Sequence, residues 1–151
     1  MRFEQAPSEP LASAVGFLLS WNGKRMAHSF EKELEPLGLR PPHFGVMNLI
    51  AVQPGCAQQN LVEGSMIDPS SMVRVIDELE EMGLAERRVD PADRRRRAVH
   101  LSAAGNRKLE QARKVAATTV EQVLEPLDEG ERETLRMLLR KLAGVKELTP
   151  G

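Results

Sequence analysis

Residues 67–105 read IDPSSMVRVIDELEEMGLAERRVDPADRRRRAVHLSAAG, and they predict a capped helix followed by a basic hairpin. Asp68 is a favoured N-cap residue, Pro69 suits the first helical position, and Gly83 is a common helix terminator. Four apolar residues between them recur at helical spacing and predict one buried face: Met72, Val75, Ile76 and Leu79. This is the strongest local signal in the chain.

The opposite face of this predicted helix is mostly polar and carries Ser70, Ser71, Val73, Arg74 and Asp77. At about 1.5 Å per residue the helix is roughly 21 Å long, a length that can lie in a major groove of DNA. We therefore take this face as a candidate nucleic-acid contact.

A β-hairpin is predicted after the helix, with strands at 84–89 and 98–101 and a tip at 90–97. Residues 87–100 carry a net charge of +4, which leaves −5 on the rest of a chain whose net charge is −1. A basic cluster on an acidic body is typical of contact with a polyanion, although a solvated charge run has the same composition. The chain has no tyrosine and few other aromatic residues, so duplex DNA is favoured over stacked single strands.

The remaining elements are predicted to be helices, at about 8–36, 43–52, 58–65, 102–126 and 128–144. Ser8, Ser102 and Asp128 are their candidate N-caps, and Glu131 completes a capping box with Asp128. A short helix, a capped helix and a hairpin in this order form a winged helix-turn-helix.

The sequence thus predicts a mainly α (α+β) fold in which 1–151 is a single domain. The winged helix-turn-helix lobe is expected at about 43–102. The helices at about 8–36 and 103–145 have apolar stripes without a partner in the chain, so we expect them to form a dimerisation lobe.

Composition excludes several other classes of protein. The chain is 41% hydrophobic, which suffices for a core, and no apolar run is long enough to span a membrane. The N-terminus lacks the pattern of a secretory signal, so we expect a cytoplasmic protein. The single cysteine, Cys56, has no disulfide partner, and His28, His43 and His100 are too scattered for a metal cluster. No catalytic constellation is visible, so neither an enzyme nor a cofactor is expected.

The stretch 67–105 resembles the multiple-antibiotic-resistance-regulator (MarR) family of winged helix-turn-helix transcription factors, and the resemblance extends over about 10–143. The matching motifs are Leu79-Glu80 to Leu84, Asp90 to Arg95, Val99 to Ser102, and Gly105. Glu78 departs from the pattern, since many members carry a basic residue there. The resemblance implies a ligand-responsive repressor that binds a pseudo-palindromic DNA operator as a homodimer.

Within the predicted recognition helix, Arg74 is the candidate reader of a base, with guanine its usual partner. The alternative is that Arg74 contacts a phosphate or an acidic neighbour such as Asp77 or Glu78. Ser70 and Ser71 lie at the positive end of the helix dipole, where they can bind phosphates or base edges.

In the wing, Asp93 and Arg95 match the family's D-x-R positions. The resemblance implies that Arg95 enters the minor groove while Asp93 holds its side chain. Arg94, Arg96 and Arg97 would then contact phosphates or form structural salt bridges. The alternative is that the four arginines form a mobile solvated loop.

Family members commonly bind a small anionic or aromatic effector between the two lobes. Trp21, Asn22 and His43 lie on segments that should flank such a cleft, so they are the candidate effector contacts. Two other functions stay open. One is a redox or metal sensor that uses Cys56 or the histidines, although an inert cysteine is favoured. The other is a winged-helix module that binds protein rather than DNA.

Overall fold

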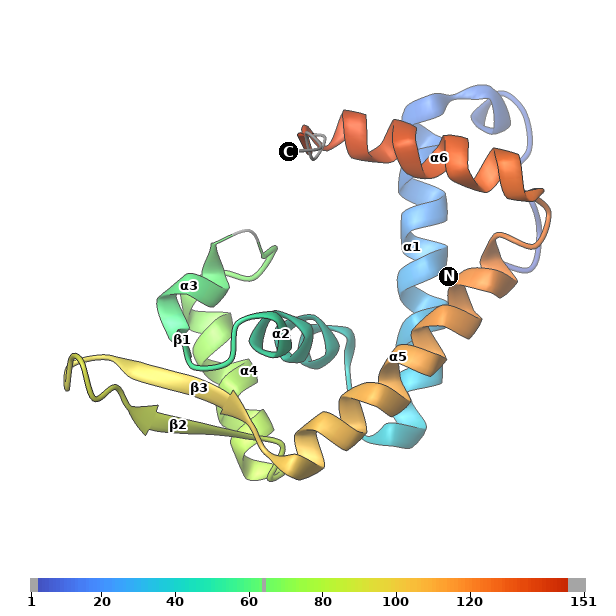
Figure 1. Ribbon diagram of the computed structural model, residues 1–151. Coiled ribbons are helices and arrows are strands. Elements are labelled where there is room, and N and C mark those ends of the chain that lie inside the picture. Colours follow the sequence, from blue (N-terminus) through green and yellow to red (C-terminus); the bar gives the residue numbers. More distant parts are fainter. Residues whose placement is uncertain (1–2, 64, 147–151) are drawn as a thin grey trace. The chain divides into compact units, whose positions relative to one another are not determined.

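The computed structural model describes residues 3–63 and 65–146, and the chain divides into two compact units. The first unit ends at Thr119 and the second begins at Val120. The fold is mainly helical with one small antiparallel sheet, which confirms the predicted class (Figure 1). Among the described residues, no helix is both long and apolar enough to cross a membrane.

The first unit opens with four helical segments: η1 (Leu11–Ser13), α1 (Val15–Leu34), η2 (Glu35–Leu37) and α2 (Pro41–Val52). The prediction that Ser8 caps the first long helix was wrong, because α1 begins at Val15 with Ala14 as its N-cap. Pro10 disfavours a helical conformation in the residue before it, so a helix cannot start smoothly from Ser8. Residues 11–13 form a separate 3-10 turn instead.

The helix-turn-helix consists of α3 (Gln58–Val62) and α4 (Pro69–Glu81). The helix predicted over 58–65 is therefore shorter than expected. Its end is fixed by Ser65, whose hydroxyl donates to the Val62 carbonyl at 2.9 Å. The second helix matches its prediction closely, from the Asp68 cap to Gly83, which has the left-handed φ of +71° that favours glycine.

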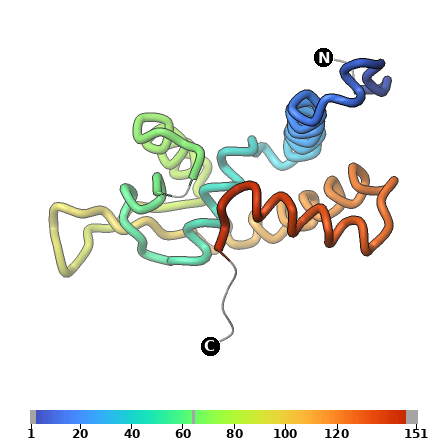
Figure 2. The backbone as a smooth tube through the Cα atoms, turned by 90° about the horizontal axis from the view of Figure 1, so that it is seen from above, coloured from blue at the N-terminus to red at the C-terminus, as the bar shows by residue number. Residues whose placement is uncertain are grey.

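The hairpin is present as β2 (Ala85–Val89) and β3 (Arg97–Leu101), which pair antiparallel. A third strand, β1 (Cys56–Ala57), pairs with the other edge of β3, so the strand order is β1-β3-β2. This strand was not predicted. In Figure 2 the loop of the hairpin extends away from the helices of the first unit.

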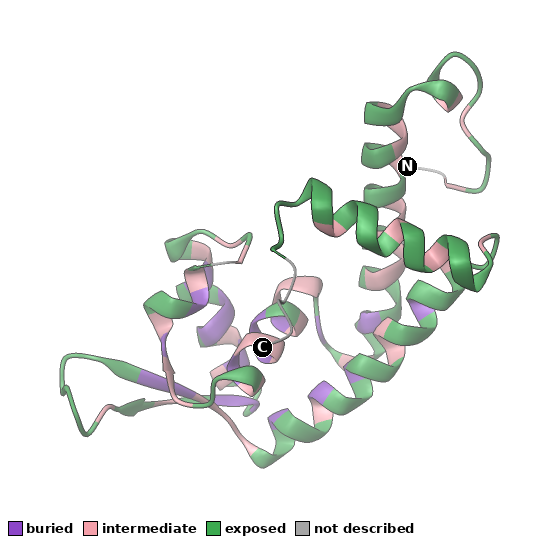
Figure 3. Ribbon diagram, turned by 45° about the horizontal axis from the view of Figure 1, so that its top comes forward, coloured by how far each residue is buried: buried purple, intermediate pink, exposed green. Residues whose placement is uncertain are grey.

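The core of the first unit forms where α4 packs against the neighbouring helices and the sheet. Figure 3 shows the buried positions in the helices of the first unit and in β3. The predicted apolar face of α4 is buried, and its members are at most 3% exposed: Met72, Val75, Ile76 and Leu79. They pack in one cluster with residues of α1, α2, α3, β3 and α5. Burial of each such side chain contributes about 1.5–3 kcal/mol, so this cluster fixes α4 in place.

Helix α5 (Ala103–Val123) begins directly against the base of the hairpin. The Ser102 hydroxyl accepts the N–H of Gly105 at 2.9 Å and donates to the Gly83 carbonyl at 2.6 Å. Gly105 is buried, and a Cβ placed on it would lie 1.9 Å from the carbonyl oxygen of Leu84. Only glycine therefore allows this approach of helix to backbone.

The second unit contains the end of α5 and helix α6 (Glu129–Leu142). The predicted capping box is present, because Asp128 accepts the N–H of Glu131 and Glu131 accepts the N–H of Asp128, both at 2.9 Å. No residue of α6 is buried. Its apolar side chains are exposed, among them Met137, Leu138, Leu139 and Leu142.

Candidate nucleic-acid interface

The start of α4 is organised by the carboxylate of Asp68. This group accepts the N–H of Ser71 at 3.0 Å and the hydroxyls of Ser70 and Ser71 at 2.6 and 2.7 Å. The hydroxyls and the backbone N–H hold the pKa of Asp68 well below its ordinary value. Both hydroxyl protons are thus donated to Asp68, so in this conformation the two hydroxyl groups offer a ligand only their oxygen lone pairs.

Arg74 lies on the exposed face of α4, one turn after the cap. Within residues 3–63 and 65–146, no hydrogen bond or ion pair involves its guanidinium, and its two acidic neighbours have other partners. Asp77 binds Arg87, and Glu78 binds Arg40 and His43. The alternative contact of Arg74 with an acidic neighbour is therefore absent here, and its guanidinium is available to a ligand. Val73, also predicted to face DNA, is 40% exposed beside it.

Arg87 belongs to the basic run of the sequence, but its guanidinium binds other residues of the protein. Its side chain is only 19% exposed and forms ion pairs with Asp77, at 2.6 Å, and with Glu80. It also donates to the Val73 carbonyl at 3.3 Å and to the Gln58 side-chain oxygen at 2.9 Å. One side chain thus fastens β2 to α4 and α3.

The wing tip has the opposite character. In the described part of the chain, no carboxylate pairs with Arg94, Arg95, Arg96 or Arg97, all of which are exposed. The guanidinium of Arg97 donates to the carbonyl oxygen of Arg94 at 3.2 Å. The basic run thus divides into structural arginines and four that are free to bind an anion.

Asp93 binds the backbone of the wing tip rather than a guanidinium. Its carboxylate accepts the N–H of Arg95 at 3.0 Å, and its carbonyl oxygen accepts the N–H of Arg96 at 3.0 Å. The resemblance implied that Asp93 holds the Arg95 side chain, and this structure shows a backbone contact in its place. Asp90 braces the same turn by accepting the N–H of Ala92 at 2.9 Å.

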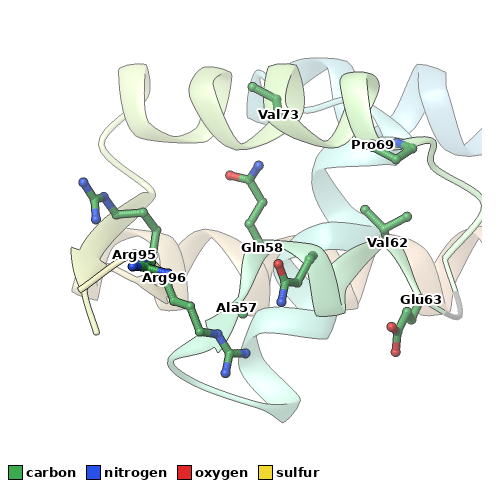
Figure 4. A pocket seen from close by; sticks show the side chains of 10 residues that line it. Ala57, Gln58, Val62, Glu63, Pro69, Val73, Arg95 and Arg96 are labelled. Atoms are coloured by element: carbon green, nitrogen blue, oxygen red, sulfur yellow. The ribbon is translucent and has the colours of Figure 1, made fainter. Parts of the chain in front are cut away.

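A groove of about 520 Å³ separates the wing tip from the two helices of the helix-turn-helix (Figure 4). Gln58, Gln59 and Val62 of α3 line it, Pro69 and Val73 of α4 form a second side, and Arg95, Arg96 and Arg97 form a third. Ala57 and Glu63 complete the lining. The groove brings the exposed face of α4 together with three of the predicted wing residues. Sequence reasoning missed Gln58 and the role of Arg87.

The predicted effector residues are not assembled into one described cavity. Trp21 packs edge-on against Phe3, with ring centroids 5.6 Å apart, and Arg25 lies over its ring. Asn22 is exposed and donates to the Leu18 carbonyl of its own helix at 2.8 Å. Asn22 therefore interrupts the apolar stripe by bonding to its own backbone.

His43 is buried, 4% exposed, and both of its ring nitrogens are used. Nδ1 accepts the backbone N–H of Arg40 at 2.9 Å, so the proton of the neutral ring lies on Nε2 and is donated to Glu78 at 2.6 Å. This bond and the Arg40 guanidinium hold the pKa of Glu78 below its ordinary value, despite some desolvation. His43 therefore connects the start of α2 to α4.

Cys56 is half-buried in β1, and burial raises the pKa of its thiol, so little of it is the reactive thiolate. Across the described residues, no group of three or more histidine, cysteine or acidic side chains is placed to hold a metal ion.

Helices α3 and α4 with the β2–β3 hairpin make this chain a winged helix-turn-helix protein. The MarR family model matches residues 37–96. Transcriptional regulator HosA of Escherichia coli O111:H- is 33% identical over 115 residues, which cover 76% of this chain and 85% of HosA. The chain belongs to the MarR family of transcriptional regulators.

Two solved structures of the repressor CouR extend the likeness. CouR of Rhodococcus jostii RHA1 bound to p-coumaroyl-CoA is 30% identical, with a TM-score of 0.80 over 94% of this chain and 100% of that chain. CouR bound to a 23-mer DNA duplex is 28% identical, with a TM-score of 0.83 over 93% of this chain and 99% of that chain. These two structural neighbours of the chain were therefore solved with a ligand, p-coumaroyl-CoA, and with DNA, respectively.

Proposed function

We propose that this regulator is a homodimeric repressor that binds a specific double-stranded operator and releases it when a small anionic or aromatic effector binds. The observation that carries this proposal is the wing tip, where Arg94–Arg97 lack carboxylate partners among the described residues while Arg87 and Arg88 have them. Exposed, unpaired guanidiniums clustered beside a capped helix suit a polyanion, because Arg pairs with phosphate in a bidentate manner. A catalytic role forms no part of the proposal.

In this proposal α4 enters the major groove and the wing reaches the adjacent minor groove. Arg74 reads a base edge, Val73 packs against the bases, and Ser70 and Ser71 contact phosphates once their hydroxyls turn from Asp68. Arg95 enters the minor groove, where a narrow groove concentrates negative potential. The residues at about 43–102 form the DNA-binding lobe.

The DNA-binding proposal is tested by selecting duplexes from a random pool and measuring their affinity by fluorescence anisotropy at several salt concentrations. A selected duplex should bind about 10³-fold or more tightly than an unrelated one, and affinity should fall steeply with salt. Failure to enrich any duplex would leave the winged-helix protein-interaction module as the better function.

The dimer proposal rests on apolar side chains that the single chain leaves exposed. Leu11, Val15 and Leu19 near the N-terminus are 45–72% exposed, and Leu138 and Leu142 of α6 are 58% and 70% exposed. A second copy that covers both helix faces removes this apolar area from water. Analytical ultracentrifugation should give twice the 16.8 kDa of one chain, and a stable folded monomer would contradict the dimer.

For the effector we propose contact with Trp21 and Asn22. His43 is left out of this proposed contact, because its two ring nitrogens bind Arg40 and Glu78 and thereby hold α2 to α4. Because Trp21 is the only tryptophan and the chain has no tyrosine, its fluorescence reports directly on this segment. Aromatic carboxylates that bind should quench Trp21 and raise the thermal midpoint, while a binder that leaves Trp21 unchanged would place the site elsewhere.

A further inference from the structure

Gln58 is the first residue of α3, and the orientation of its amide is fixed by the wing. The Nε of Arg87 donates to the side-chain oxygen of Gln58 at 2.9 Å. A guanidinium only donates hydrogen bonds, so the amide atom that faces it must be the oxygen rather than the nitrogen. The Nε2 of Gln58, with its two protons, is consequently turned away from Arg87.

That nitrogen has no partner in the described part of the protein, and it is not sealed from water. No hydrogen bond from Nε2 is found within residues 3–63 and 65–146, and no buried side-chain nitrogen or oxygen there lacks a partner. Because Gln58 is half-buried, Nε2 must therefore be reached by solvent. Figure 4 shows the Gln58 side chain reaching from α3 toward α4, in the groove that the wing arginines border.

The surroundings of Gln58 favour an anion. Arg95, Arg96 and Arg97 border the same groove of about 520 Å³, and Glu63 is the carboxylate in its described lining. A neutral amide donor beside three cations suits the oxygen atoms of a phosphate, which accept hydrogen bonds from Gln as well as from Arg. In helix-turn-helix proteins the first helix crosses the DNA backbone, and α3 is that helix here.

We propose that Gln58 is a further DNA contact, which donates a hydrogen bond from Nε2 to a backbone phosphate of the bound duplex. Arg87 is its positioning residue. The inference rests on the proposed function, and it assigns a role to a residue that the motifs did not identify. We do not expect Arg87 itself to contact the DNA, because its guanidinium binds Asp77, Glu80 and the Val73 carbonyl.

The test compares two variants of Gln58 in the full-length protein. Gln58→Met keeps the length of the side chain and removes both the donor and the oxygen that accepts from Arg87. Gln58→Glu keeps an acceptor for Arg87 and replaces the donor with a charged oxygen. Asn60→Asp is the matched control, because it adds the same charge to an exposed position of α3 outside this groove. Circular dichroism and the thermal midpoint confirm that each variant is folded.

Binding is measured on a duplex selected by the wild type and on an unrelated duplex. Gln58→Met should weaken both by the same factor, about tenfold for each subunit on the DNA, since a phosphate carries no sequence information. The salt dependence should stay that of the wild type, because no charge is lost. Gln58→Glu should bind more weakly still, and Asn60→Asp should bind close to the wild type.

Two results would overturn the inference while leaving DNA binding intact. Wild-type affinity of Gln58→Glu would show that the residue acts only through Arg87. A changed preference at one base pair would show that Gln58 reads a base rather than a phosphate. If the wild type itself binds no duplex, the proposed function fails instead, so the two failures are distinguishable.

Discussion

Replacing Asp93 by asparagine or by alanine should have opposite effects on operator binding. The carboxylate accepts the N–H of Arg95 at 3.0 Å and thereby shapes the turn that presents Arg94–Arg97. Asparagine keeps a side-chain oxygen for that bond, and it removes a negative charge from the wing tip. Alanine removes both the charge and the bond. Simple electrostatics predicts tighter binding for both variants, so only a positioning role separates them.

The size of the effect follows from one exposed hydrogen bond. Losing it frees the wing tip at a cost of about 1 kcal/mol, or about fivefold in affinity for each subunit. A dimer that uses both wings loses the square of that factor, about 25-fold, in Asp93→Ala. Asp93→Asn should bind the operator at least as tightly as the wild type.

The assay is fluorescence anisotropy with the selected operator between 50 and 200 mM salt, and Arg95→Ala is the companion variant. Arg95→Ala should reduce the slope of log affinity against log salt concentration by about 0.9 for each lost contact. For a dimer that loses two contacts, the fall in affinity between 50 and 200 mM salt should be roughly tenfold smaller than in the wild type. The Asp93 variants should keep the wild-type slope. Equal losses in Asp93→Asn and Asp93→Ala would refute the reasoning, because they would show that the carboxylate charge, and not the turn, is what binding needs.

Three further predictions concern α4 and the packing around it. Arg74→Ala should cost about 1–3 kcal/mol on the operator and relax the preference at one base pair in a competition assay, whereas a uniform loss on all duplexes would identify a phosphate contact. Gly105→Ala should lower the stability of the folded protein by about 1–3 kcal/mol in thermal melts, because its Cβ would lie 1.9 Å from the Leu84 carbonyl oxygen. The control Gly45→Ala has no atom within 4 Å of the added Cβ and should raise the stability by up to about 1 kcal/mol. Shifts of the same sign in the two variants would contradict the packing described. The pKa of Glu78 is lowered from 4.5, so its contribution to stability is complete above that pH and is lost as the pH falls through the folded value. The free energy of unfolding, measured across pH 3–6 (a range of about three units around the ordinary pKa), should therefore fall less steeply with acid in Glu78→Gln than in the wild type. An unchanged pH profile would argue against this role of Glu78.

The parts of the fold that the sequence predicted well are those with local signals. Helix α4 has a cap, an apolar period and a terminating glycine within a few turns, so its limits at Pro69 and Glu81 follow from nearby residues. Strand β1 has only two residues and forms because β3 lies beside it. Its existence depends on a pairing between Cys56 and Val99, which no local pattern encodes.

The candidate site was predictable as a region but not as a set of contacts. Sequence shows a run of arginines, and the structure separates those that face carboxylates from those that do not. One signal for Arg87 was present: it lies two residues after buried Ala85 on β2, so both share the inward face of the strand. Its partners Asp77 and Glu80 could not be inferred, because they meet Arg87 only when β2 packs on α4.

For His43, too, the sequence could predict the local contact but not the distant one. A histidine near an expected cleft suggested an effector contact, whereas the ring completes the N-terminal hydrogen bonding of α2 and binds Glu78. The capping role is local and could have been found, since His43 is the third residue of α2 and can accept the N–H of Arg40. The bond to Glu78 spans 35 residues and could not.

The acidity of α4 has a consequence for how such a protein finds its operator among the many sites of a genome. The helix carries Asp77, Glu78, Glu80 and Glu81 against the single cation Arg74, and two arginines from outside it hold three of these carboxylates in place. Under the proposed function, a random duplex would meet these carboxylates and would gain contacts only from the wing, so we expect it to bind weakly. With about 10⁶–10⁹ competing sites, weak retention on random DNA raises the fraction of protein free to search. Under the proposed function, carboxylates that weaken the retention of random DNA would therefore increase the occupancy of the operator.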